Sequence, residues 1–192
     1  MKGDVACAKM WLITVICKLR GCRSADIVRL CWNQLTRVDN EIVFKPKVFK
    51  NKRYSGRWMF SIKIEEGEDN IQEALDLVKM NAKDKSKSGK IFDNWTTSQV
   101  TYYFDKYSSK IGENLTCHRI RVLTCLALTK IGWSDSSIKS FLNWRSSESL
   151  ETYRTGFSVE GMREDKSILN AYSSKLVAAS VRDWKYKFGN KI

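Results

Sequence analysis

The amino-acid sequence predicts a single, mainly α-helical domain that carries a small antiparallel β-sheet. A length of 192 residues with 43% hydrophobic residues suits one domain with a substantial buried core. Apolar residues recur at helical spacing through most of the chain. Only the region near residue 60 alternates apolar and polar residues as a strand does, so the β-structure should be limited.

Two helices are predicted at the start of the chain. Residues 5–19 are apolar over a helical run length, and Gly21 ends that helix. Ser24 is a suitable N-cap for a second helix. Its expected apolar face consists of Ile27, Val28, Cys31 and Leu35. Arg23 would then stand on a turn just before this helix, where its side chain can reach outward.

Residues 41–45 and 57–64 are predicted strands of a small antiparallel hairpin or sheet. Trp58, Phe60, Ile62 and Ile64 alternate with Met59, Ser61 and Lys63. The connection between the strands holds Pro46, the only proline of the chain, and Gly56. Both residues favour a turn.

The remaining pattern is helical. Helices are expected over about 69–81, 96–111 and 118–131, from a Ser134 cap to about residue 142, briefly before Tyr153, and over 164–186. Residues 83–90 are polar and lysine-rich with one glycine, which predicts an exposed loop.

The charge of the chain favours a polyanionic partner. It has 34 Lys and Arg against 21 Asp and Glu, a net charge of +13. Nucleic acid is the first candidate and an anionic membrane the second, although a merely soluble basic protein is the plainer interpretation. Met10–Cys17 is apolar but too short to cross a membrane, and we expect no membrane partner.

The cysteines argue against a metal centre. None of the 6 cysteines forms a C-x-x-C pair, and His118 is the only histidine. We therefore expect no zinc site. Free thiols in apolar helical stretches indicate a reducing compartment, either cytoplasm or nucleus.

One spaced set of residues carries the chemistry. His118 and Arg121 lie three residues apart, Trp144 follows His118 after 26 residues, and Tyr153 follows Trp144 after 9. Arg23 stands upstream. Cleavage of a phosphodiester needs a nucleophile, positively charged groups that neutralise the non-bridging oxygens, and a proton for the leaving oxygen. A tyrosine phenol, two arginines, an imidazole and an indole N–H can supply these functions.

The order and spacing of these residues resemble the catalytic domain of tyrosine recombinases, which include phage integrases, Cre and relatives. The resemblance covers residues 5 to about 175. It implies that residues 1–192 have the fold of this catalytic domain. The N-terminal helical domain with which most members clamp the other side of the DNA would be absent. The resemblance further implies DNA cleavage and rejoining through a 3′-phosphotyrosine at Tyr153, in site-specific recombination or DNA integration, with no cofactor.

The resemblance also assigns roles to the other residues. Arg23 and Arg121 would bind the non-bridging oxygens, and Asp26 would orient Arg23. Arg20 is the rival for Arg23 but lacks an acidic residue three positions later. His118 would exchange a proton with the tyrosine or donate to the oxyanion. Trp144 takes the place that most members fill with a second histidine.

A hairpin lysine is the family's general acid. Lys50 fits the position best here, and Lys47 and Lys52 are alternatives. The other basic residues expected to grip DNA phosphates include Arg53, Arg119 and Arg145.

The expected partner is double-stranded DNA. Family members act as dimers or tetramers on paired sites, so residues 164–192 are a candidate subunit contact, although this chain by itself could be monomeric. A viral or mobile-element source would suit the family. Two alternatives stay open: a type IB topoisomerase that relaxes supercoils, and a recombinase-derived DNA-binding protein without catalysis.

Overall fold

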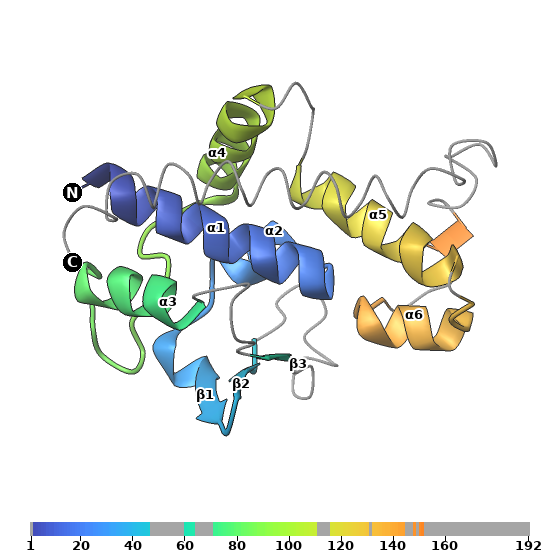
Figure 1. Cartoon of the computed structure of the whole chain (residues 1–192), viewed down its shortest axis with the longest axis horizontal. Helices are drawn as coiled ribbons and strands as arrows, with labels where there is room; N and C mark the ends of the chain where they lie inside the picture. The colour runs from blue at the N-terminus through green and yellow to red at the C-terminus, as the bar shows by residue number, and fades with distance from the viewer. Residues whose placement is uncertain are drawn as a thin grey trace.

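The structure, a computed structural model, describes residues 2–46, 60–63, 71–110, 116–130, 132–144, 148 and 150–151. Figure 1 shows α1 (Lys2–Arg20) running through the middle of the molecule, with α4 above it and α5 and α6 beyond its C-terminal end. The side chains from Cys7 to Cys17 are all buried. A helix that is apolar on every side is stable only when other elements surround it. Accordingly α1 contacts α2, α3, α4 and α5.

The second predicted helix is much shorter than expected. α2 spans only Ser24–Ile27, and a 3₁₀ turn, Trp32–Gln34, follows. The prediction of a continuous apolar helical face as far as Leu35 was wrong. The cause is non-local: the Trp32 N–H donates to the Gly89 carbonyl at 3.0 Å, and the Asn33 N–H donates to the Lys87 carbonyl at 2.6 Å. These two backbone N–H groups therefore bond to a loop that is distant in sequence, and they are not available for hydrogen bonds within a helix.

A three-stranded antiparallel sheet follows, in the order β1-β2-β3. β1 is Leu35–Val38, β2 is Glu41–Phe44 and β3 is Phe60–Lys63. β2 and β3 confirm the two predicted strands. β1 was not predicted because three of its four residues are exposed, which leaves no apolar alternation. Ile42 pairs with Ile62, and both side chains are buried.

Four further helices lie close to their predicted bounds. They are α3 (Ile71–Met80), α4 (Thr97–Lys110), α5 (Cys117–Lys130) and α6 (Asp135–Phe141). Ser134 caps α6 as predicted, accepting from the Ser137 N–H at 3.2 Å. Most of the hairpin turn and the predicted helix 164–186 lie outside the described residues.

The main core surrounds α1, and a smaller core joins α5 to α6. The smaller one contains Cys125, Ile138, Leu142, Trp144 and Leu150. Within the described ranges, none of the helices combines the length and hydropathy needed to span a bilayer.

Candidate functional site

Arg23 stands at the turn between α1 and α2, as predicted. It is the N-cap residue of α2 with extended backbone (φ −78°, ψ 141°), whereas Ser24, the predicted cap, is the first helical residue. The Arg23 side chain is one-third exposed, and its Nη1 lies 3.8 Å from Asp26 Oδ2. The rival Arg20 instead lies over the Phe141 ring, at 5.7 Å from its centroid. Arg23 therefore pairs with Asp26, the acidic residue three positions later.

The Asp26 carboxylate is the electrostatic link between the two predicted arginines. Its side chain is only 7% exposed. Burial raises its pKa, while the charges of Arg23 and Arg121 both act to lower it. One buried carboxylate therefore lies within the electrostatic reach of both guanidinium groups.

Arg121 is buried, at 3% exposure, and joins three parts of the fold. Its Nη1 donates to the Gly21 carbonyl and its Nη2 to the Leu142 carbonyl. Its Cζ lies 5.1 Å from the centroid of the Trp144 ring. The guanidinium group on α5 is therefore fixed by the turn after α1 and by the end of α6.

Gly21 makes this arrangement possible. Its φ of +55° lies in the left-handed region, and a Cβ there would come within 2.4 Å of Leu142 Cδ2. Glycine meets both conditions without backbone strain and without displacing Leu142. The helical pattern marks Gly21 as a helix end, but nothing in it indicates that its carbonyl, or that of Leu142, would hold Arg121.

Trp144 lies beside Arg121, directly after α6. Its backbone N–H donates to the Lys139 carbonyl at 2.8 Å, after Asn143 with φ +52°. The side chain is 9% exposed and belongs to the smaller core. Packing and contact with the arginine are thus both observed for Trp144.

His118 and Arg119 lie on the first turn of α5 and are exposed. His118 precedes Arg121 by three residues, a rise of about 4.5 Å along the helix. The Thr116 hydroxyl accepts from the Arg119 backbone N–H at 3.1 Å, which is the pattern of an N-cap. An imidazole therefore stands at the solvent-facing end of the helix that carries the buried arginine.

Three buried thiols adjoin the site. Cys17 Sγ lies 3.3 Å from Cys117 Sγ. The hydrogen bond with Cys117 and burial raise the pKa of Cys17, and burial raises the pKa of Cys22. All 6 cysteines are free, as predicted, and 5 of them are buried. The described residues contain no group of three or more metal-ligating side chains.

The structure thus brings together Arg23, Asp26, Arg121 and Trp144, with His118 one turn away. The other predicted site residues lie outside the described residues: Tyr153, Lys47, Lys50, Lys52, Arg53 and Arg145. The described part can neutralise a bound anion with two guanidinium groups and offer an imidazole beside it.

Comparison with known proteins identifies the family and agrees with this fold. Residues 5–158 match the phage integrase family. No curated protein sequence matches the chain. Among solved structures, the XerH site-specific recombinase bound to its difH substrate in a pre-cleavage complex is similar, with a TM-score of 0.57 at 16% identity. The match covers 88% of this chain and 48% of XerH, so the chain spans about half the length of that recombinase.

At this identity the likeness to XerH concerns the fold, a mainly helical catalytic domain with a small antiparallel sheet. The family match covers most of the chain and includes Arg23, His118, Arg121 and Trp144. This chain belongs to the phage integrase family of tyrosine recombinases.

Proposed function

We propose that this protein breaks and rejoins DNA strands through Tyr153 in site-specific recombination or DNA integration. The observation that carries the proposal is the pair of arginines, Arg23 and Arg121, whose charges both act on the buried Asp26 carboxylate. XerH, the similar recombinase, is bound to its substrate in a pre-cleavage complex, which supports DNA as the substrate class.

In the proposed reaction the Tyr153 phenolate oxygen attacks the scissile phosphorus and the bond to the 5′-oxygen breaks. The products are a 3′-phosphotyrosine and a free 5′-hydroxyl. Attack by a 5′-hydroxyl on the phosphotyrosine reverses the step, so the bond energy is retained and no cofactor is consumed.

The positive charges act on the phosphate during this step. Arg23 and Arg121 bind the non-bridging oxygens, and their planar guanidinium groups suit the trigonal-bipyramidal transition state. Asp26 holds Arg23 in place. His118 exchanges a proton with the tyrosine or donates to the oxyanion, and Trp144 donates its indole N–H.

A hairpin lysine completes the proposed machinery. Lys50 protonates the leaving 5′-oxygen, with Lys47 or Lys52 as the alternative donor. We further propose that residues 1–192 form one catalytic domain, that Arg53, Arg119 and Arg145 contact DNA phosphates, and that dimers or tetramers assemble on paired sites. Its six free thiols suit a place of action in cytoplasm or nucleus.

The test is covalent trapping on a nicked DNA substrate, from which the short strand beyond the cleavage site diffuses away. The wild-type chain should give a protein–DNA adduct that resists denaturation, and Tyr153→Phe should give none. Tyr102→Phe is the matched control, since Tyr102 is 61% exposed on α4. An adduct that persists in Tyr153→Phe would refute the assigned nucleophile.

Two further outcomes would favour the other functions. DNA binding without any adduct from the wild-type chain would favour a non-catalytic binding protein. Relaxation of a supercoiled plasmid that lacks any specific site would favour a type IB topoisomerase.

A further inference from the structure

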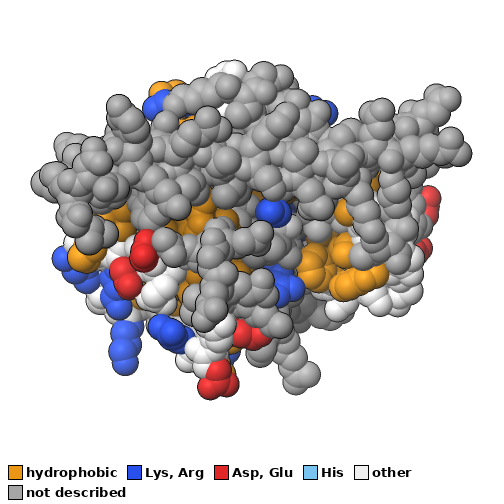
Figure 2. Space-filling model, in the orientation of Figure 1, with side chains coloured by type: hydrophobic (Ala, Val, Ile, Leu, Met, Phe, Trp, Pro, Cys, Tyr) orange, Lys and Arg blue, Asp and Glu red, His pale blue; other side chains and the backbone are white. Residues whose placement is uncertain are grey.

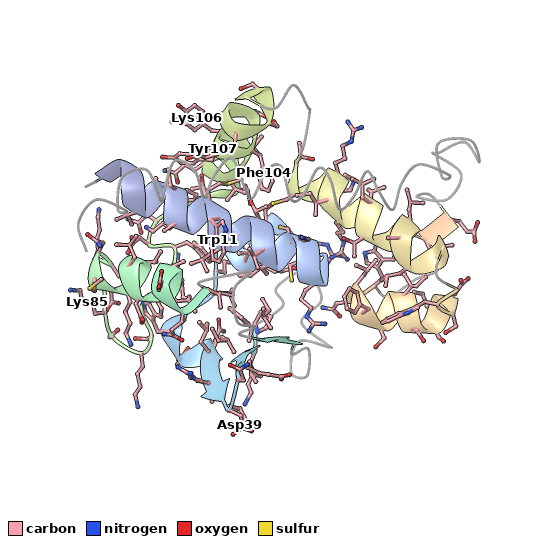
Figure 3. The ribbon with its side chains drawn as sticks, in the orientation of Figure 1. Trp11, Asp39, Lys85, Phe104, Lys106 and Tyr107 are labelled. Carbon is pink, nitrogen blue, oxygen red and sulfur yellow. The ribbon has the colours of Figure 1, made fainter. Side chains whose placement is uncertain are left out.

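The loop after α3 is a strongly charged feature that the proposed cleavage site does not use. Residues 83–90 carry Lys83, Lys85, Lys87 and Lys90, and all four lysines are exposed. We call this segment the lysine loop. Figure 3 places Lys85 at the far end of α3, and Figure 2 shows Lys and Arg side chains projecting from the same side of the molecule, with some acidic side chains nearby.

The backbone of the lysine loop is fixed by hydrogen bonds. The Gly89 and Lys87 carbonyls accept from the Trp32 and Asn33 N–H groups, and Lys90 forms an antiparallel bridge with Cys31. A Cβ at Gly89 would lie 2.3 Å from the Asp84 carbonyl oxygen, so the turn is tightly closed. The loop therefore presents its lysines from a formed scaffold.

Asp84, the one acidic residue of the lysine loop, stabilises its turn. Asp84 Oδ1 accepts from the Ser86 N–H at 2.9 Å, and hydrogen bonds from Ser86 lower the pKa of this carboxyl. Within the part of the chain that the structure describes, no carboxylate pairs with any of the four loop lysines. Four lysines against one aspartate leave a net charge of +3 on eight residues.

The lysine loop is separate from the site that contains Arg23 and Arg121. The Lys83 N–H donates to Asp93 Oδ1 at 3.0 Å, and Asp93 pairs with Lys9 on α1. Lys9 and Gly21 are 12 residues apart along α1 and its end. At 1.5 Å per residue this is about 18 Å. This length of α1 corresponds to roughly five base pairs of duplex DNA, in which the phosphates of one strand recur about every 3.4 Å along the axis.

We propose that the lysine loop is a second DNA-contact surface, which binds phosphates of the duplex several base pairs from the scissile phosphate. The inference rests on the proposed function for its partner, DNA. Lysine ammonium groups are point charges that bind phosphate without demanding a particular geometry, so this contact would add affinity without base specificity. The fixed backbone limits the entropy lost on binding to that of the side chains.

The experiment compares two variants of equal net charge in the Tyr153→Phe chain, so that no cleavage interferes. One carries Lys85→Gln and Lys87→Gln, since only the backbone of Lys87 holds the loop. The control carries Lys106→Gln and Lys139→Gln, on α4 and α6. Binding to a 30-base-pair duplex is measured at several KCl concentrations, and circular dichroism confirms that both variants are folded.

The slope of log affinity against log salt should become shallower by about 2 in the loop variant, since each lost lysine–phosphate contact contributes close to 1. The control slope should stay unchanged. Equal changes in both variants would mean that only total charge matters and would overturn the proposal. An unchanged loop slope, with loss of binding to phosphatidylserine vesicles, would identify a membrane contact instead.

Failure here is distinguishable from failure of the proposed function. Trapping on saturating DNA reports the chemistry of Tyr153 and is independent of the lysine loop. A chain that forms the adduct but keeps its salt slope in the loop variant would refute only this second contact.

Discussion

At the scale of single residues, Arg121 unites stability and proposed chemistry. Its guanidinium ties the Gly21 and Leu142 carbonyls together while lying against Trp144 and within electrostatic reach of Asp26. A variant at Arg121 would leave two buried carbonyls without their donor, which is costly in itself. Lost activity in such a variant would therefore not isolate a catalytic role, whereas neighbouring residues permit cleaner tests.

Gly21→Ala should destabilise the fold by about 2–4 kcal/mol. The left-handed backbone contributes roughly 1–2 kcal/mol, and the overlap with Leu142 contributes the rest. Gly132→Ala is the matched control, because Gly132 also has a positive φ of +85° but nothing within 4 Å of its Cβ position. Urea denaturation measures the free energy of unfolding of both variants. Equal losses would show that the contact with Leu142 is unimportant.

Asp26→Asn should separate activity from stability. Burial raises the pKa of Asp26, so ionisation of this carboxyl weakens the fold. At pH 7 the variant should therefore melt no lower than wild type. Adduct formation should nevertheless slow at least about tenfold, because Arg23 loses the partner that positions it.

The pH dependence of stability checks the same substitution. The amide of the Asp26→Asn variant does not titrate, so the difference in melting temperature between the two chains isolates the carboxyl. Because the folded pKa is raised, wild-type stability relative to the variant should increase as pH falls through that pKa towards the unfolded value of about 4. A large fall in the melting temperature of the variant at pH 7 would contradict this expectation.

At the scale of elements, the sequence predicted those whose stability is local. α3 and α4 have apolar stripes on one face, and α1 is mostly apolar from residue 7 to residue 17, so their patterns were sufficient. The segment after α2 was mispredicted because its backbone donors bind residues 87 and 89, more than fifty positions later. Periodicity within one segment carries no information about such partners.

The same limit applies to the site. Arg23, Asp26, Arg121 and Trp144 were predicted because their side-chain types and spacing resemble a known family. The carbonyls of Gly21 and Leu142 were not predicted, since a backbone carbonyl is present at every residue and leaves no mark in the sequence. The catalytic roles of these four residues, like those of Tyr153 and the hairpin lysines, remain predictions.

The pair between Lys9 and Asp93 joins α1 to the segment before α4. Their side chains are 6% and 14% exposed. Asp93→Asn should destabilise the fold by about 2–4 kcal/mol, because the Lys9 ammonium would remain buried without its partner charge. The double variant Lys9→Met/Asp93→Asn should recover part of this loss in urea denaturation. Additive effects of the two substitutions would argue against a direct interaction.

At the scale of the whole molecule, repulsion among the excess positive charges, a net +13, should lower the stability of the DNA-free fold. Raising KCl from 50 to 300 mM should increase the melting temperature in calorimetry by about 2–4 °C, equivalent to roughly 1 kcal/mol for a chain of this size. Sodium sulfate tested at equal ionic strength is the control for effects beyond screening. A melting temperature that is constant over this range would contradict the expectation.

The bond from Arg121 to Gly21 joins residues one hundred positions apart. A chain emerging from the ribosome exposes Gly21 and Arg23 long before Arg121 is made, and the Leu142 carbonyl comes later still. An incomplete or partly folded chain is already basic enough to adhere to DNA, yet it has no assembled pair of arginines. Under the proposed function, the protein would be able to cut DNA only after its tertiary structure is complete. The order of synthesis would therefore prevent strand breaks by unfinished chains.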